Sequence, residues 1–383
     1  MQYDLFPYRP SMPTEESYEW VTDILEVHLG NEQRLKIRKF PRQKFEWAVH
    51  VSSNSHFAKL KSMLFGNFEN RFIIPVWTEA QRIDSSFISG STSLNVDTKH
   101  YDFQNSQYIS LWEDETFNEF VEIQDVSDNT ITLKTPLIYS YSSLSFIMPA
   151  KRAYLEQTNT FDIYSHVKEI NLFWRVEFNK GIEALELETQ YKDYDVLADP
   201  FDIDGNSITK EIRQSLNKID YQIGSIEVFS RMDWHRQSIQ NVHFDLVGRE
   251  KIWNFKRWLH NISGRLNSFW IPNFEHDIQV IEYGTTLIIE NIFYYRYLQD
   301  NPMFQNIICY KYDGSVEIRK ITGCSEISNS EETITLNSGL GDPDDIKAIY
   351  FLGLYRLDTD RVELSHEEEN VVSVTFPVIG VEE

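Results

Sequence analysis

Alternation of apolar and polar residues is the most frequent pattern along the chain, and it predicts strands. The clearest run spans residues 45–52, in which every second residue is apolar. A helix is predicted next, because Phe57, Leu60 and Leu64 stand at helical spacing. An aromatic strand then runs into Pro75, and a proline suits the end or the edge of a strand because it has no N–H to donate. This order predicts a helix lying on one face of a curled antiparallel sheet.

The same order recurs in the second half of the chain, so the sequence predicts an internal duplication. Strand-like residues 242–247 are followed by a helical pattern at 252–259 and by an aromatic strand that contains Pro272. A glycine is expected to end each helix, Gly66 in the first copy and Gly264 in the second.

Flanking segments also correspond and predict a further small β module in each half. Residues 130–133 and 333–336 both read Thr-Ile-Thr-Leu, and upstream Leu25-Glu26-Val27 is matched with Ile226-Glu227-Val228. The dipeptide Asp313-Gly314 is a strong signal for a two-residue hairpin turn. Several matched blocks in the same order support the duplication.

We therefore expect a mainly β fold with a few short helices, in which a helix-backed β-sandwich or barrel unit occurs in tandem and each copy carries a small β-barrel module. The expected division is an extended N-terminal arm (1–14), the first helix-backed unit (15–85), the first small β module (86–192), an acidic linker (193–209), the second helix-backed unit (210–290), and the second small β module with the C-terminal strand (291–383).

Charge and composition narrow the function classes. The 383 residues include 36 Lys and Arg against 59 Asp and Glu, a formal net charge of −23 that would repel a phosphate backbone. We therefore expect no sequence-specific nucleic-acid binding, although a negative wall suits a conduit through which DNA slides. Cys309 and Cys324 have no metal-type spacing and form no disulfide framework. Without a long apolar run or a signal-like N-terminus, neither a membrane span nor a signal peptide is expected.

Metal-site patterns are incomplete. Residues 202–206 with Glu211 resemble a calcium loop, but Pro200 stands where the first ligand is needed, so a solvated linker is the preferred interpretation. The remaining histidine candidates lack the spacing of a zinc site on a helix. They are His50, His243, His276 next to Asp277, and His366 before three glutamates. We expect no metal and no cofactor.

Catalytic patterns are equally weak. Ser89–Ser93 with Asp97 and His100 has the residue types of a hydrolase triad, but its composition indicates a loop. Carboxylates cluster near Trp112 as glycoside hydrolysis would need, although charge along a strand and turn explains them too. This cluster consists of Glu113, Asp114, Glu115 and Glu119. No catalytic residue is assigned, and the chain is not expected to be an enzyme.

The segments that define the repeat also carry a resemblance. Glu32-Gln33-Arg34, Pro41-Arg42 and Ile74–Trp77 resemble a family of bacteriophage minor tail proteins, found at the tail tip of long-tailed phages. The second half is similar through a further set of segments. They are Gly264-Arg265, Phe269–Pro272, Asp277, Leu354–Asp358 and Asp360–Leu364.

The resemblance implies a distal-tail ring that adapts the tail tube to the baseplate hub and lines the DNA conduit in the virion tail, after synthesis in the host cytoplasm. Its partners would be copies of itself, the tube protein, the hub and other tip proteins, and the tape measure protein. Two copies of one unit favour a trimer with pseudo-sixfold symmetry, with a hexamer as the alternative. A receptor- or carbohydrate-binding module, with exposed aromatics around Trp112 or Tyr141, is a second reading, and a cell-wall-degrading enzyme a third.

Overall fold

The computed structural model describes residues 3–26, 31–67, 69, 71–156, 160–164, 167–200, 208–230 and 232–383. The expectation of a mainly β fold with few helices is confirmed, because antiparallel strands dominate the described residues. Two α-helices occur in this part of the chain, α1 (Asn54–Gly66) and α2 (Arg249–Ile262), together with a π-helical turn at Tyr294–Leu298. Short 3-10 turns lie at Trp77–Glu79, Pro302–Phe304 and Pro343–Asp345.

The first unit is an antiparallel sheet backed by α1. Its strands are β1 (Asp4–Leu5), β2 (Ser11–Glu19), β5 (Arg42–Val51), β6 (Arg71–Pro75), β12 (Phe146–Leu155), β13 (Thr160–Ile163) and β14 (Lys168–Val176). The alternating residues of β5 point into a core with Trp174 of β14, and Leu60 is the buried residue of α1. The predicted N-terminal arm is part of this unit, since β1 pairs with β6 and Phe6 is buried.

A small β module with its own core stands on the first unit. Its strands are β7 (Gln81–Arg82), β8 (Ser93–Asn95), β9 (Tyr108–Trp112), β10 (Asn118–Ser127) and β11 (Thr130–Leu133). It is an insertion, because β9 pairs with β12, which also pairs with β6 of the first unit. The expected boundary at residue 85 therefore cuts the sheet: β12 and β14 were placed with the module. Alternation reveals a strand but not the partner it will pair with.

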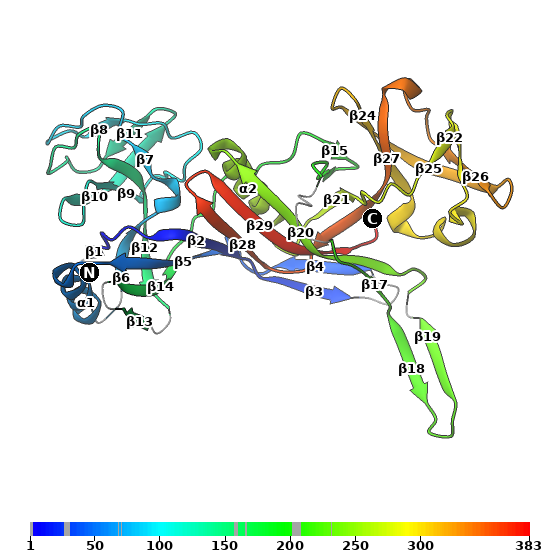
Figure 1. Ribbon diagram of the computed structural model, residues 1–383, viewed down its shortest axis with the longest axis horizontal. Helices are drawn as coiled ribbons and strands as arrows, with labels where there is room; N and C mark the ends of the chain where they lie inside the picture. Colours follow the sequence, from blue (N-terminus) through cyan, green and yellow to red (C-terminus); the bar gives the residue numbers. More distant parts are fainter. Residues whose placement is uncertain are drawn as a thin grey trace.

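The second unit repeats this arrangement, with α2 on its sheet. Its strands are β17 (Lys210–Arg213), β20 (Arg236–Val247), β21 (Ser268–Pro272), β27 (Ile346–Leu357), β28 (Arg361–Glu368) and β29 (Val371–Gly380). Its small module contains β22 (Val280–Glu282), β23 (Thr286–Glu290), β24 (Asn306–Lys311), β25 (Val316–Glu326) and β26 (Glu331–Leu336). The units and modules lie side by side along the long axis of the molecule, with the termini far apart (Figure 1).

The strand pairings of the two units correspond one to one. The order β5, β14, β12 and β6 of the first unit matches β20, β29, β27 and β21 of the second. The registers agree as well, since the ladder Leu155–Trp174–Phe45–Glu16 has the counterpart Leu357–Val378–Ile239–Lys210. Descent from a duplicated ancestor stays a prediction, but the equivalence of positions is a property of the fold.

Each unit also carries a two-stranded hairpin, which lies between β2 and β5 in the first unit and between β17 and β20 in the second. The hairpin of the first unit is β3 (Thr22–Glu26) with β4 (Glu32–Lys36), and that of the second is β18 (Leu216–Asp220) with β19 (Ile226–Ser230). The expected match of Leu25 with Ile226 is therefore wrong, because it sets the first strand of one hairpin on the second strand of the other. Local sequence likeness misled here, and Val27 lies outside the described residues.

The predicted acidic linker is packed where it is described. A short hairpin of β15 (Gln190–Tyr191) and β16 (Tyr194–Asp195) precedes Val196, which bridges to Trp270. Asp195 is buried and accepts a hydrogen bond from the Trp258 indole at 3.1 Å. Residues 201–207, with the calcium-like loop, lie outside the described residues.

Candidate assembly junction

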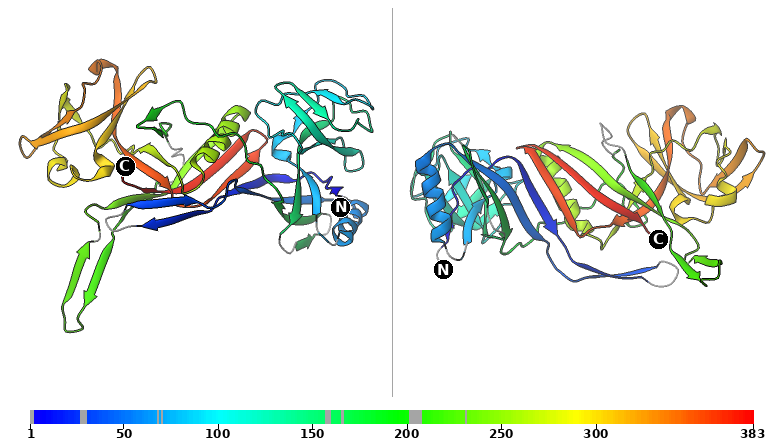
Figure 2. Two further views of the ribbon diagram at one scale, coloured as in Figure 1. Left: turned by 180° about the vertical axis from the view of Figure 1, so that it is seen from behind. Right: turned by 60° about the horizontal axis from the view of Figure 1, so that its bottom comes forward.

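The two units share one continuous sheet. Strand β2 of the first unit pairs on one side with β5 and on the other with β28 of the second unit, where Thr14–Glu19 lie opposite Arg361–His366. Figure 2 shows the blue strands of the first unit beside the red strands of the second unit in both views. Backbone hydrogen bonds thus fix the relative position of the units.

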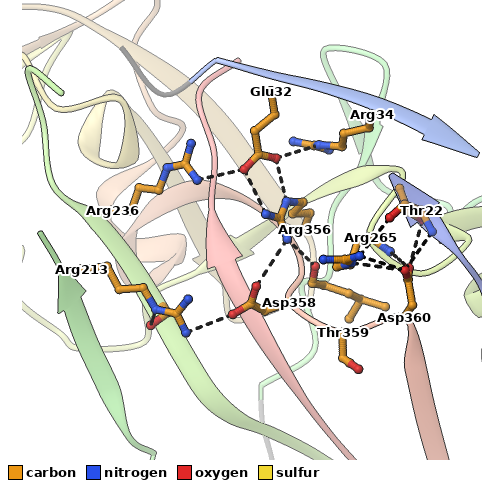
Figure 3. A network of polar contacts seen from close by, with 12 residues as sticks. Thr22, Glu32, Arg34, Arg213, Arg236, Arg265, Arg356, Asp358, Thr359 and Asp360 are labelled. Atoms are coloured by element: carbon orange, nitrogen blue, oxygen red, sulfur yellow. Dashed lines mark hydrogen bonds and ion pairs between the residues drawn. The ribbon is translucent and has the colours of Figure 1, made fainter. Parts of the chain in front are cut away.

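The β3–β4 hairpin extends this junction, since it leaves the first unit and lies against the second. Its Glu32 side chain is only 2% exposed and binds two arginines of the second unit. Arg356 donates from Nε and NH2 at 2.7 and 2.9 Å, and Arg236 donates from NH1 at 2.8 Å (Figure 3). Burial alone would raise the pKa of Glu32, but Arg356 and its neighbours outweigh it and lower the pKa to about 2.

A second polar contact holds the base of the hairpin. Asp360 directly precedes β28. It accepts hydrogen bonds from the Thr22 N–H at 2.8 Å and from the Arg265 N–H at 3.0 Å (Figure 3). The backbone at Gly264 lies so close to Trp20 of the first unit that a side chain on Gly264 would clash with it. The hairpin is therefore fastened at both its base and its end.

A buried charge cluster lies between α2 and the first unit. Lys256 forms ion pairs with Glu16 of β2 at 2.7 Å and with Glu79 at 3.1 Å, and Arg249 reaches Glu79 at 2.9 Å. Arg249 and Lys256 are seven residues apart and so share one face of the helix. All of these side chains except Arg249 are essentially inaccessible.

The charge cluster includes further polar side chains of both units. Glu16 also accepts from the Tyr18 hydroxyl at 2.6 Å and from Gln43 at 2.7 Å, and it contacts His366 at 3.1 Å. Burial opposes ionisation of Glu16, but Lys256 and His366 hold its pKa well below the ordinary value. The pKa of His366 is lowered, because burial disfavours its charged form.

Side chains of both units meet in this buried cluster. The cluster is filled by its own side chains, and an ion pair broken inside it would leave buried charge. Polar hollows of about 430 and 490 Å³ flank the hairpin end near Asn31 and Glu383. Their position beside the junction makes them part of the same contact region.

The structure does not bring the triad-like residues together. Ser89 donates to the Ile138 carbonyl, Asp97 accepts from the Lys99 N–H, and the His100 carbonyl accepts from Arg249. The carboxylate cluster caps turns: Glu119 accepts from the backbone of Ile138 and Asp114 from that of Thr116. Two Thr116 hydrogen bonds lower the pKa of Asp114.

The histidine candidates are scattered in the same way. His50 contacts Glu169, His243 contacts Thr375, and His276 contacts the Tyr350 hydroxyl. Asp277 instead accepts from the Asn273 amide. No group of three or more metal-type side chains occurs among the described residues. Both cysteines are free, Cys309 buried and Cys324 half-buried.

The aromatic surface expected of a carbohydrate-binding module is not formed by the residues named for it. Tyr141 is buried, and Trp112 is half-buried, stacks edge-on against Trp77 and donates to the Pro7 carbonyl at 2.7 Å. In the described part of the chain no helix combines the length and apolarity needed to cross a bilayer.

The residues that form the junction were not singled out from sequence. Lys256 carried a usable signal, since it interrupts the apolar face of a helix between Ile252 and Leu259. Glu16 and Glu79 carried none, because each becomes buried only when distant segments meet. A search of protein-family models and of curated proteins finds no match to this chain.

Proposed function

We propose that the chain is a structural ring component of a bacteriophage tail tip, adapting the tail tube to the hub. The observation that carries this proposal is the junction: two equivalent units are held side by side by strand pairing and a docked hairpin. A ring needs this kind of fixed, repeated contact, and one chain already supplies one such step.

The outward faces of the hairpins support the same proposal. On β3–β4 the exposed apolar residues are Leu25 and Leu35, and the equivalent positions on β18–β19 are Ile219 and Phe229. Exposed apolar pairs at equivalent positions suit a partner with repeated binding sites, such as the sixfold ring of a tail tube. Three chains would present six such pairs.

The acidic balance agrees with a conduit for DNA, because a net charge of −23 disfavours adhesion of a phosphate backbone. The alternatives of a receptor-binding module and of a cell-wall-degrading enzyme gain no support from the placement of Trp112, Tyr141 or the carboxylates.

A conditional phage mutant tests this role. Without the chain, we expect heads to form and tail assembly to stop before functional tips appear, and a plasmid copy to restore infectivity. Normal, infectious tails lacking the chain would overturn the proposal. Electron microscopy of particles from the two conditions gives the readout.

A further inference from the structure

The second unit has an edge strand, β17, and a hairpin, β18–β19, that are equivalent to β2 and β3–β4 of the first unit. In the second unit these elements do not pack against another unit. The strands of both hairpins are five residues long, and β3 follows β2 at the same spacing as β18 follows β17. Yet β3–β4 lies against the second unit, whereas β18–β19 projects away from the body of the molecule (Figure 1; Figure 2, left). Its apolar side chains include Ile226 at 62% and Val228 at 52% exposure.

The strand before this hairpin is equally uncovered. Ile212 of β17 is the equivalent of Tyr18 of β2, since each lies two residues beyond the paired positions Lys210 and Glu16. Tyr18 is 3% exposed because β28 and α2 cover it, whereas Ile212 is 71% exposed. Among the described residues β17 pairs with β20 alone, so its other edge is open.

The first unit offers the complementary edge. Strand β13 is the equivalent of β28, because Phe161 lies opposite Ile170 as Leu364 lies opposite Val374. Within the described residues β13 pairs only with β14. The open edges of β13 and β17 are the two outer edges of the shared sheet, whose strand order is β13-β14-β5-β2-β28-β29-β20-β17 (Figure 1). One chain therefore cannot join them, but a second copy can.

We infer that β17 and the β18–β19 hairpin of one chain dock on the first unit of the next chain, repeating between chains the junction that joins the two units within a chain. This inference rests on the proposed ring. The expected register follows from the ladder: Glu16 faces Leu364, so Lys210 faces Phe161 of the next chain. One residue further, Glu211 faces Thr160, as Ser17 faces Glu363.

The side chains at the hairpin end are complementary in this arrangement. Glu32 of the docked hairpin corresponds to Ile226, and its partner Arg356 corresponds to Tyr154, because Arg356 faces Ser268 as Tyr154 faces Arg71. An ion pair within the chain is thus replaced by an apolar contact between chains. Glu32 and Arg356 are both replaced, whereas the second partner of Glu32, Arg236, corresponds to Arg42 and remains an arginine.

Cysteine pairing tests the register. Cα atoms of facing residues in antiparallel strands lie about 4.5–5.5 Å apart, within reach of a disulfide. Glu211→Cys chains mixed with Thr160→Cys chains should form disulfide-linked dimers of unlike chains, and the double variant should give a closed covalent trimer on non-reducing gels. Asp162→Cys, two positions out of register, is the matched control with Glu211→Cys, and unsubstituted protein controls for Cys309 and Cys324.

An exchange of side chains tests the hairpin. Ile226→Glu should weaken self-association at least about tenfold, because it places a carboxylate against Tyr154 and leaves it only Arg42, one of the two arginine positions that Glu32 uses within the chain. Adding Tyr154→Arg should restore association by recreating the Glu32–Arg356 pair. Ile219→Glu, on the outward face of the same hairpin, should leave association unchanged. Mass photometry across a concentration series measures each variant, and thermal melting shows that the monomers remain folded.

The outcomes distinguish a failure of the proposed contact between chains from a failure of the proposed role in the phage tail. Cross-linking at the stated register together with rescue by Tyr154→Arg supports the inference. A trimer that forms without cross-linking and ignores Ile226→Glu overturns this contact and leaves the ring proposal standing. A chain that stays monomeric and uncross-linked at all concentrations also overturns the contact, whereas the phage mutant alone decides the role in the tail.

Discussion

Lys256 of the second unit and Glu16 of the first form a buried ion pair of 2.7 Å, with both side chains at or below 1% exposure. Lys256 also contacts Glu79, so one ammonium group bridges two carboxylates from segments distant in sequence, and Arg249 supplies the second positive charge. The pair ties α2 to the first unit, and its loss would leave charge without a partner in a dry site.

Lys256→Met should therefore lower the free energy of unfolding by about 3–5 kcal/mol, the usual loss when one partner of a buried pair is removed. Lys61→Met is the matched control, because Lys61 occupies the equivalent position on α1 and is exposed. That control should change stability by no more than about 0.5 kcal/mol. Urea unfolding measures both, and equal losses would contradict a special role for Lys256.

Acidification should loosen the same region. Burial lowers the pKa of His260 to about 4, so the folded state binds fewer protons than the unfolded state between pH 6.5 and pH 4. The stability that depends on neutral His260 is complete above pH 6.5 and is lost as the pH falls towards 4, by about 3 kcal/mol. His260→Asn should reduce the dependence of the unfolding free energy on pH across this window, with buried His366 accounting for part of what remains, and His235→Asn, at an exposed site, is the surface control. An unchanged slope in His260→Asn would refute the assignment.

Glu32→Gln should release the β3–β4 hairpin from the second unit. Arg356 and Arg236 are 5% and 6% exposed and would each lose their closest anionic partner, keeping Asp358 and Glu26 respectively, at a cost of about 2–4 kcal/mol. Hydrogen exchange should show faster exchange of the β3–β4 amides, with little change in β5. Gln33→Ala, on the exposed face of the same strand, serves as the control. Undiminished protection in Glu32→Gln would mean that the ion pairs do not hold the hairpin.

Gly264→Ala should destabilise the junction by about 1–3 kcal/mol. Gly264 has a φ of +70°, and a Cβ there would lie 2.5 Å from Asp360 Oδ1 and 2.9 Å from Trp20 Cβ. Gly66→Ala, at the end of α1, meets no atom within 4 Å and should be neutral. Thermal melting compares the two; a neutral Gly264→Ala would show that the close approach is not needed.

Local patterns in the sequence predicted the local structure well. The run at 45–52, the helical spacing of Phe57, Leu60 and Leu64, and the strand before Pro75 became β5, α1 and β6 in that order. Each of these depends on the period of neighbouring residues, which a sequence displays directly. The helix ends were predicted less evenly: α1 ends at Gly66, but α2 ends at Ile262, before the left-handed Ser263 and Gly264.

What depends on distant segments was not predicted. Strands β12 and β14 were assigned to the wrong side of a boundary, because alternation does not name the strand's partner. Glu16 and Glu79 look like ordinary surface carboxylates until α2 covers them. The open edges of β13 and β17 could not be predicted either, because whether a strand has one partner or two depends on segments elsewhere in the sequence.

The most direct test of the central claim is averaged cryo-electron microscopy of intact tails, with the density of this chain counted at the tail tip. We expect three chains in one ring at the distal end of the tube, their six units related by pseudo-sixfold symmetry. Six chains in the ring, or no density for the chain at the tail tip, would contradict the account.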